Sequence, residues 1–451
     1  MRKVKTVAIV GAGITGMTAA YFEALKGNFV YLIEMDDRPG GLLKSEHNEF
    51  GSFDYGTHVG TKLGEKELDD FLFSGMTKKD FEFFNPGESG NYYAGKLSSK
   101  SPFVNTEHLE REVINQANID LLSSGNDTTP ENLEEAMIAR YGLTIYEQIF
   151  KNLLQKFMGP NAAKLSPEVL YFFDMNRLLA FDSTVTDRLK TIACYDEVLG
   201  FHYPCPGRQK IYPKVGGISF WIDFLMAKLE KAGVKFLAGT RVNAITNVDG
   251  SITHINTGKK EIKIDKLIWT IPAALFSRLA NPSTVLPKPK FRKTGLYNFS
   301  FKKPLNSKCY YINIYDESLL SARMTLYQNL TNSNKYYSCT IEVLQDDDFD
   351  FESSVDKILA EIYTMNLADE NNECVYKGMI PINNGFPILD FDYIKNTNDL
   401  LISLKASFNN VTFLGRGNGG FFMRDVLKHT YQSIVIDELA YKEKRRLKII
   451  P

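Results

Sequence analysis

The chain opens with a short series of apolar segments separated by polar residues. Thr6–Val10 is apolar and rich in β-branched side chains, as is typical of a strand buried in a parallel sheet. Apolar residues then recur at helical spacing from Ile14 to about Lys26, and Phe29–Ile33 is a second short apolar run. The pattern predicts a strand, a helix and a second strand, which together begin an α/β sheet.

Three kinds of pattern follow along the chain. From Thr106 to about Leu179 the spacing is mainly helical, and another helix is predicted from about Ser219 to Ala232. Val234–Ile245 is predicted to be a pair of strands, and Leu267–Pro272 contains a further strand. Between about Lys288 and Asn384, short apolar and polar runs alternate and are rich in Tyr and Phe, which predicts antiparallel strands.

Composition narrows the possible partners. The 451 residues are 44% hydrophobic and 24% charged, values typical of folded proteins, and suffice for about two or three domains. Lys plus Arg (53) nearly balances Asp plus Glu (54), so no overall field attracts a polyanion and no nucleic-acid partner is expected. The five cysteines are scattered, which predicts reduced thiols and neither a disulfide framework nor a metal site.

Membrane insertion is not expected from the sequence. No window reaches the roughly 18 uninterrupted apolar residues that a spanning helix needs, so we predict a cytoplasmic protein without a transmembrane segment. The basic first residues followed by an apolar stretch are also compatible with a signal peptide. The three glycines that come next explain these residues better.

Those glycines form the motif Gly11-Ala12-Gly13-Ile14-Thr15-Gly16 between the first strand and the first helix. The first glycine permits a tight turn, the second lets the backbone approach a pyrophosphate, and the third lets helix and strand pack closely. The helix start faces the phosphates with free N–H groups and its positive dipole end. Glu34, at the end of the second strand, can accept hydrogen bonds from ribose hydroxyls, so the pattern predicts an adenosine dinucleotide without a 2′-phosphate.

The residues after Glu34 narrow the dinucleotide to FAD. Glu34-Met35-Asp-Asp-Arg38-Pro-Gly40-Gly41-Leu42 continues to Ser45 and resembles the E-x-x-x-R-x-G-G-x-x-x-S motif of the flavin amine oxidase, protoporphyrinogen oxidase and UDP-galactopyranose mutase superfamily. The resemblance implies that Arg38 and the glycine pair lie along the diphosphate and ribityl chain of FAD. A simple β-turn is the alternative, but a turn alone would not require Glu34 and Arg38 at this spacing.

Phe53-Asp-Tyr-Gly56-Thr57-His58 resembles an element that lies beside the isoalloxazine ring in this superfamily. The resemblance implies that Gly56, Thr57 and His58 contact the cofactor. It makes His58 the best histidine candidate for tuning the flavin or moving a proton. A purely structural histidine is the alternative.

Three further segments resemble the same superfamily. The hairpin around Asn91–Leu97 precedes the helical substrate-binding region. Tyr212–Ile218 resembles a Y-P-x-G-G element that returns the chain to the FAD domain, here with one extra residue. By the same resemblance, the main chain of Val242 meets the adenine ring, and Leu267–Pro272 is the strand that crosses behind the cofactor.

The C-terminal segments complete the resemblance. Asn384–Ile388 and then Val411–Arg416, with Gly415 and Arg416 at its end, resemble the last strand of the FAD domain in the mutase-like branch. Gly419–Asp425 opens a final helix, whose first residues Met423, Arg424 and Asp425 would aim the positive helix end at the flavin. The basic cluster Lys442–Lys448 could touch anionic lipid, or simply be the solvated end of the last helix.

The resemblance spans nearly the whole chain and predicts an α/β fold, α+β overall. A Rossmann-like FAD-binding domain is assembled from residues 1–64, 213–287 and 386–451. Residues 65–212 form a largely helical cap, and residues 288–385 form an antiparallel sheet that contributes to the substrate site. In that sheet, Arg323 and several tyrosines could line a polar pocket, although a half-buried sheet face explains them too; the tyrosines are Tyr310, Tyr311, Tyr327, Tyr336 and Tyr337.

Three functions remain open from the sequence. The first is an FAD-dependent oxidoreductase that accepts a hydride from a small molecule, which could be a sugar nucleotide of polysaccharide biosynthesis, with His58, Arg323 and Arg416 as catalytic candidates. The second is a redox-neutral sugar-nucleotide mutase that uses reduced flavin. The third is a non-enzymatic escort protein on the same fold, although the intact Glu34 and Arg38 argue against it. A homodimer is possible in each case.

Overall fold

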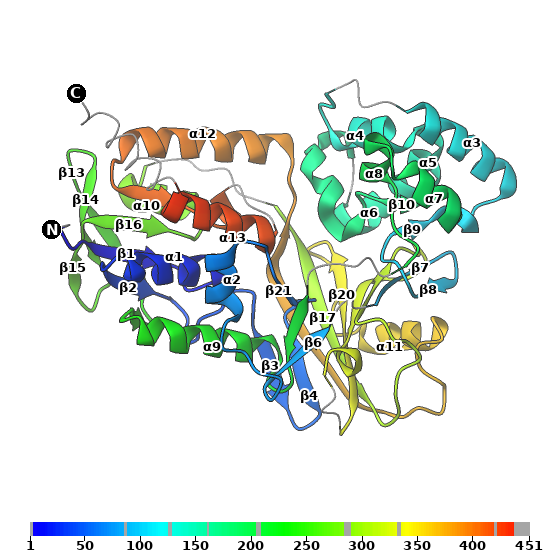
Figure 1. The fold of residues 1–451 in the computed structure, drawn as a ribbon, viewed down its shortest axis with the longest axis horizontal. Coiled ribbons are helices and arrows are strands. Elements are labelled where there is room, and N and C mark those ends of the chain that lie inside the picture. Colours follow the sequence, from blue (N-terminus) through cyan, green and yellow to red (C-terminus); the bar gives the residue numbers. More distant parts are fainter. Residues whose placement is uncertain are drawn as a thin grey trace.

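The computed structural model describes residues 3–84, 88–124, 129–159, 162–203, 209–283, 290–331, 335–418 and 422–436, without the side chains of residues 383 and 384. Gly419–Phe421 and the basic cluster Lys442–Lys448 lie outside these residues. Figure 1 shows a lobe built on a parallel sheet at the left, a group of short helices at the upper right and a large sheet between and below them. None of the helices in the described part of the chain combines the length and the apolar character of a membrane span.

The parallel sheet has five strands drawn from distant parts of the chain. Their spatial order is β12 (Lys235–Leu237), β2 (Phe29–Ile33), β1 (Thr6–Val10), β16 (Lys266–Trp269) and β22 (Val411–Phe413). All four pairings are parallel. The Rossmann-like fold class expected from the sequence, with a domain assembled from discontinuous segments, is therefore confirmed.

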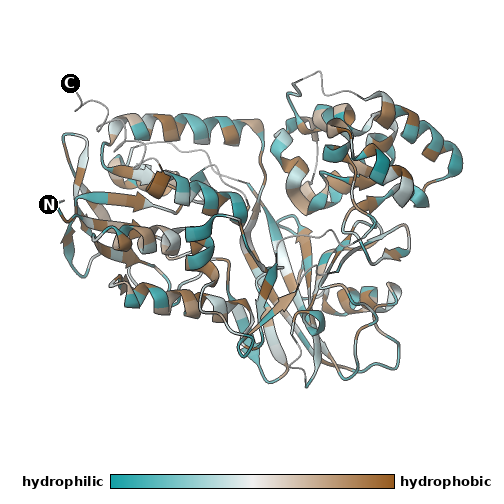
Figure 2. Cartoon of the chain, in the orientation of Figure 1, coloured by the Kyte–Doolittle hydropathy of each residue, from teal (hydrophilic) through white to brown (hydrophobic). Residues whose placement is uncertain are grey.

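Helices and a small sheet cover the two faces of the parallel sheet. One face packs against α1 (Ile14–Leu25), α9 (Gly217–Lys231) and α13 (Met423–Tyr431), with α2 (Lys66–Phe73) beside them. The other packs against α10 (Ala273–Ala280), α12 (Phe391–Ser407) and the sheet made by β13 (Ala244–Val248), β14 (Ser251–Asn256) and β15 (Glu261–Lys263). Figure 2 shows the hydrophobic strands between these layers, whereas α12 at the surface alternates in hydropathy. Burial on both faces explains why these strands are continuous apolar runs.

The second large sheet has seven strands. Their order is β21 (Cys374–Pro387), β17 (Phe291–Phe301), β20 (Tyr337–Gln345), β19 (Ser321–Leu326), β18 (Tyr311–Ile314), β7 (Ser89–Tyr93) and β8 (Lys96–Ser98). β7 pairs in parallel with β18, and the other neighbours are antiparallel. The predicted hairpin near Asn91 therefore extends the edge of this sheet.

The two faces of this sheet differ in polarity. One face is apolar and packs against α11 (Val355–Thr364), as with Ile312, Met324 and Ile341. The side chains that alternate with them, such as Asn313, Thr325 and Thr340, are polar and also buried. Because side chains of a strand alternate between faces, the period of two in the sequence creates one apolar and one polar face.

The helical group contains α3 (Arg111–Ser123), α4 (Leu133–Tyr141), α5 (Leu143–Ile145), α6 (Lys151–Met158), α7 (Ser183–Leu189) and α8 (Ala193–Val198). A separate core unites α3 to α6 with the 3₁₀ segment Pro167–Asp174. Three small sheets complete the fold: β3 (Ser45–Asn48) with β4 (Gly51–Asp54), β5 (Gly60–Thr61) with β11 (Lys210–Pro213) and β6 (Phe81–Phe84), and β9 (Val104–Asn105) with β10 (Leu178–Leu179).

Two local expectations differ from the structure. The strand pair expected over Val234–Ile245 is divided between two sheets, because β12 joins the parallel sheet and β13 pairs with β14. The segment at Asn384–Ile388 is not a strand of the parallel sheet. It includes the end of β21, whose Phe386 and Pro387 pair with Arg292 and Phe291, and only β22 is the last parallel strand. Both segments have suitable strand patterns, but pairing partners decide the sheet to which a strand belongs.

Candidate functional site

The glycine motif forms a tight connection between β1 and α1. Gly11 has φ +100°, a conformation that favours glycine, and a Cβ on Gly16 would collide with the carbonyl oxygen of Gly11. In contrast, a Cβ on Gly13 would have as its nearest neighbour the Cα of Gly41, 4.0 Å away. Gly11 and Gly16 are therefore needed for the fold, whereas Gly13 leaves open space at the helix start.

The second glycine pair lies directly against the first motif. The Gly40 N–H donates to the Ala12 carbonyl at 2.9 Å. Gly13 and Gly40 also form an isolated parallel β-bridge. The Glu34 carboxylate accepts hydrogen bonds from the backbone N–H groups of Ala12 (2.8 Å) and Asp36 (3.0 Å). These contacts make a backbone-lined cradle at the positive end of α1, which fits the pyrophosphate of a dinucleotide.

The other residues that the sequence predicted at the cofactor differ in how exposed they are. Met35, Arg38 and Leu42 are exposed on the segment that follows Glu34. Val242 is buried in the core beside β1 and β2. At the start of α13, Met423 packs against the core that contains α1, whereas Arg424 and Asp425 are exposed.

Gly415 connects the cradle with the rest of the site. It has φ +95°, and a Cβ there would lie 2.9 Å from the Thr270 carbonyl oxygen and 3.4 Å from Thr15 Oγ1. Thr15 is in the first turn of α1. The turn after β22 therefore lies against the helix start and directs the next residue, Arg416, toward the large sheet.

Arg416 is a largely buried cation. Its Nη2 donates to the Gly385 carbonyl at 3.1 Å, its guanidinium lies 5.8 Å from the centre of the Phe386 ring, and its buried Nε has no partner among the described residues. Burial lowers the pKa of Arg416. A buried guanidinium with an unused donor is suited to bind an anion.

The polar face of the large sheet carries a buried ion pair. Arg323 on β19 donates from Nε and Nη2 to the two carboxylate oxygens of Glu342 on β20, both at 2.8 Å. Glu342 Oε1 also accepts from the Thr57 N–H at 3.1 Å, and Thr57 Oγ1 lies 2.6 Å from Thr325 Oγ1. Burial alone would raise the pKa of Glu342, but Arg323 lowers it below its ordinary value. The pair therefore fixes the Thr57–His58 segment to the sheet.

His58 is mostly buried beside this ion pair. Burial lowers its pKa to about 4, Glu342 opposes that change, and Arg323 and Arg416 reinforce it. Its Nε2 is buried without a partner in the part of the chain that the structure describes. The three catalytic candidates, His58, Arg323 and Arg416, are thus brought together, and His58 is neutral at pH 7.

The helical group reaches into the same site through a strained turn. Phe173 and Asp174 both have positive φ, 52° and 55°. The Phe173 ring lies 5.3 Å from the Arg323 guanidinium and 5.1 Å from the Phe386 ring. Asp174 Oδ2 accepts from the Tyr311 hydroxyl (3.0 Å) and from Asn313 Nδ2 (2.8 Å). The turn therefore adds an aromatic ring between the two arginines and a carboxylate at the sheet.

A second buried carboxylate holds several of the predicted motifs together. Asp54 accepts from Ser45 Oγ (2.7 Å), from the Tyr212 hydroxyl (2.7 Å) and from the Ile218 N–H at the start of α9 (2.9 Å). Burial raises the pKa of Asp54 to about 6, although these three donors each oppose the rise. A Cβ on Gly217 would lie only 2.6 Å from Asp54 Oδ1, so glycine is required there.

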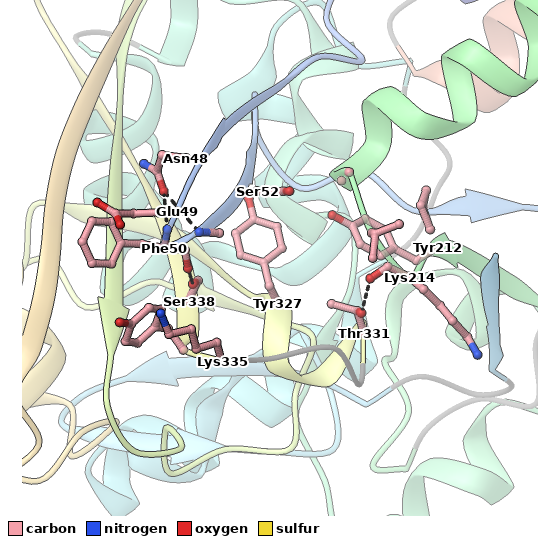
Figure 3. Close-up of a pocket in the computed structure, with 16 residues that line it drawn as sticks. Asn48, Glu49, Phe50, Ser52, Tyr212, Lys214, Tyr327, Thr331, Lys335 and Ser338 are labelled. Atoms are coloured by element: carbon pink, nitrogen blue, oxygen red, sulfur yellow. Dashed lines mark hydrogen bonds between the residues drawn. The ribbon is translucent and has the colours of Figure 1, made fainter. Parts of the chain in front are cut away.

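The five candidate tyrosines do not form one pocket. Tyr310, which is buried, and Tyr311, which is partly buried, lie near Arg323 and Asp174. Tyr327 and Tyr336 instead line a cavity of about 240 Å³, together with the β3–β4 turn and the Tyr212–Gly217 segment (Figure 3). That cavity contains none of the residues predicted to bind the cofactor. Tyr337 lies on β20.

Sequence reasoning missed three acids of this arrangement: Asp54, Asp174 and Glu342. Glu342 had a recognisable signal, since it is the single charge in the otherwise apolar centre of β20. Asp54 lay inside the motif that was assigned to His58. Asp174 had no local signal, because its role depends on a turn of the helical group that meets the sheet.

Comparisons with known proteins agree with this fold. Residues 9–72 match the NAD(P)-binding Rossmann-like domain. Coproporphyrinogen III oxidase of Staphylococcus aureus is 24% identical over 298 residues, a match that spans 60% of this chain and 61% of the oxidase. A crystal structure of reduced UDP-galactopyranose mutase superposes with a TM-score of 0.74 at 19% identity, covering 96% of this chain and 93% of the mutase. Putrescine oxidase bound to putrescine gives a TM-score of 0.62 at 14% identity, covering 97% and 99%.

The fold therefore defines the class of proteins that this chain resembles. The chain has the architecture shared by protoporphyrinogen-type oxidases, amine oxidases and UDP-galactopyranose mutase, and the resemblance inferred from the motifs is confirmed. The proteins it resembles are enzymes, in line with the enzymatic interpretation of the sequence.

Proposed function

We propose that the chain is an FAD-dependent oxidoreductase of the amine oxidase or protoporphyrinogen oxidase-like type. The main support is the single connection Gly415–Arg416. Gly415 lies against Thr15 at the pyrophosphate cradle, and Arg416 acts electrostatically on His58 beside the Arg323–Glu342 pair. The cofactor cradle and the polar sheet face thus meet at adjacent residues.

The chain has suitable groups for holding FAD. The backbone around Gly13 and Gly41 would face the pyrophosphate, Glu34 retains free lone pairs for a ribose, and Arg416 would supply a cation. Val242 would meet the adenine with its main chain, and the start of α13 would present its positive end to the ring system. When bound, FAD supplies the hydride acceptor for the reaction.

The other described residues would bind and orient the substrate. The buried polar face of the large sheet provides donors and acceptors, and the Phe173 and Phe386 rings exclude water from between the arginines. His58 is neutral at pH 7 and one ring nitrogen bonds to the Tyr55 backbone, so Nε2 can accept one hydrogen bond from the substrate without changing charge. The free thiols Cys194, Cys309, Cys339 and Cys374 suit a reducing, cytoplasmic compartment.

A redox-neutral sugar-nucleotide mutase is the second candidate. The extent of the structural match to reduced UDP-galactopyranose mutase supports it, since the likeness covers nearly all of both chains. Both candidates share the same cradle, so they differ only in the redox state that turns over and in the substrate.

Purification followed by absorption spectroscopy tests the proposal. We expect bound flavin, or uptake of added FAD, and then bleaching of oxidised flavin by one of a panel of amines and sugar nucleotides. Turnover by dithionite-reduced protein alone, with an isomeric product, would instead identify the mutase. A protein that carries no flavin and takes up no FAD would contradict both. Size-exclusion chromatography on the same sample measures whether the chain dimerises.

A further inference from the structure

Lys210 on β11 is a partly buried cation that the proposed function does not use. Its Nζ donates to the Tyr310 hydroxyl and lies 4.3 Å from the centre of the Tyr310 ring. Among the described residues, no carboxylate lies within 4.0 Å of this nitrogen. Two other partly buried ammonium groups have different partners: Lys156 and Lys228 each donate to two backbone carbonyls.

Lys210 lies beside the polar face of the large sheet. β11 pairs with β5, whose Gly60 follows His58 by two residues, and the Tyr310 ring packs edge-on against Tyr311 at 4.9 Å. The Tyr311 hydroxyl donates to Asp174, whose charge acts on both Lys210 and Arg323. The ammonium is therefore linked through two tyrosines to the Arg323 site.

The electrostatics show that this position is costly for a lysine alone. Burial lowers the pKa of Lys210 to about 8, and the charge of Asp174 only partly opposes the change. Asp174 itself already accepts from Tyr311 and Asn313, and Arg323 is neutralised by Glu342. A partly buried charge without a direct counter-ion is unfavourable, and an anionic ligand that reaches it would reduce that cost.

We propose that Lys210, with the hydroxyl of Tyr310, binds a carboxylate or phosphate group of the substrate. This assignment rests on the proposed function and adds a chemical class to it: a small molecule that is anionic at one end. A neighbouring acceptor adds a second contact, because the buried Oδ1 of Asn313 has no partner among the described residues and can accept from a hydroxyl or amine elsewhere on the same substrate. Lys210 would position the substrate and take no part in its oxidation.

The test is isothermal titration calorimetry of the FAD-saturated protein with two probes, inorganic pyrophosphate and malonate. We expect Lys210→Met to weaken binding of the preferred probe at least 10-fold, and Lys210→Arg to keep affinity within about 3-fold. The preferred probe distinguishes a phosphate from a carboxylate site. Lys228→Met is the matched control, since burial also lowers the pKa of Lys228 to about 8 while its ammonium bonds only to backbone carbonyls and Ser74.

The pH dependence gives a second readout. An anion binds the protonated amine, so the affinity of the wild-type protein should fall above about pH 8, whereas Lys210→Met should lack that fall. The other titratable groups nearby are Asp174, Tyr310, Tyr311 and Arg323. They are unchanged in the Lys210 variants, so their titration affects every variant alike. Equal affinity in the wild-type protein and Lys210→Met, or no binding of either probe, would overturn the assignment. Flavin content is measured separately, so failure of FAD binding is distinguishable from failure of this site.

Discussion

Arg323 and Glu342 join neighbouring strands of the large sheet through two hydrogen bonds of 2.8 Å, and Glu342 also accepts from the Thr57 backbone. The acid is thereby the contact between the sheet and the segment that carries His58. Because Thr57 is 285 residues away in sequence, this contact depends entirely on the tertiary fold.

Breaking this pair should destabilise the protein strongly. Glu342→Gln leaves the Arg323 charge buried without a carboxylate, and we expect the free energy of unfolding to fall by about 3–5 kcal/mol. Urea denaturation measures the change. The double variant Glu342→Gln with Arg323→Met should be less destabilised than Glu342→Gln alone, since no unpaired charge remains. Additive losses in the double variant would contradict the importance of the ion pair.

The glycines of the first motif should separate folding from cofactor binding. Gly13→Ala has room in the protein, so the variant should fold normally but lose FAD affinity by at least 10-fold, because the new methyl group points into the cradle. Gly16→Ala cannot avoid the Gly11 carbonyl oxygen and should lower the melting temperature in the absence of FAD. Fluorescence titration with FAD and thermal unfolding measure the two effects. Normal FAD affinity in Gly13→Ala would argue against the cradle.

Asp54 should make the protein less stable as pH rises from about 4 to about 6. Its pKa rises from 3.8 to about 6 on folding because of burial. The unfolded chain thus loses this proton near pH 4, whereas the folded protein holds it until about pH 6. Stability should fall across that window, by at most about 3 kcal/mol, and level off above it.

The Asp54→Asn variant isolates this contribution. An amide has no charge to bury and can still accept from the Ile218 N–H. As pH rises from 4.5 to 6.5, the melting temperature of the variant should therefore increase relative to that of the wild-type protein. Thermal unfolding at a series of pH values gives this difference. A difference that stays constant would mean that Asp54 does not titrate in that range.

His58 should not titrate near neutral pH. Burial lowers its pKa to about 4, so any change in turnover between pH 5.5 and 8 must come from another group. We expect His58→Gln, which keeps a hydrogen-bonding side chain, to leave the shape of the pH–rate profile unchanged over this range even if the rate itself falls. NMR of the histidine ring protons is the direct check. A His58 resonance that titrates with a midpoint near 6.5 would contradict the prediction.

The sequence by itself determined the local parts of the site. The spacing of Gly11, Gly13 and Gly16 between a strand and a helix predicted the cradle, because Gly11 takes a positive φ, Gly16 packs against the Gly11 carbonyl and Gly13 leaves the space at the helix start open. Alternating short apolar and polar runs, rich in Tyr and Phe, likewise predicted the antiparallel strands of the large sheet. These features follow from short-range geometry, which the order of residues specifies directly.

Only the tertiary structure decided which distant side chains meet. Alternation shows that Arg323 and Glu342 each lie on a strand, but the register between β19 and β20 places them opposite each other. In the same way, Asp54 reaches Tyr212, 158 residues away, and Asp174 reaches Tyr311 through a strained turn. Pairing register and packing between lobes arise from the summed contacts of the whole chain, so no local pattern could have predicted these three acids as partners.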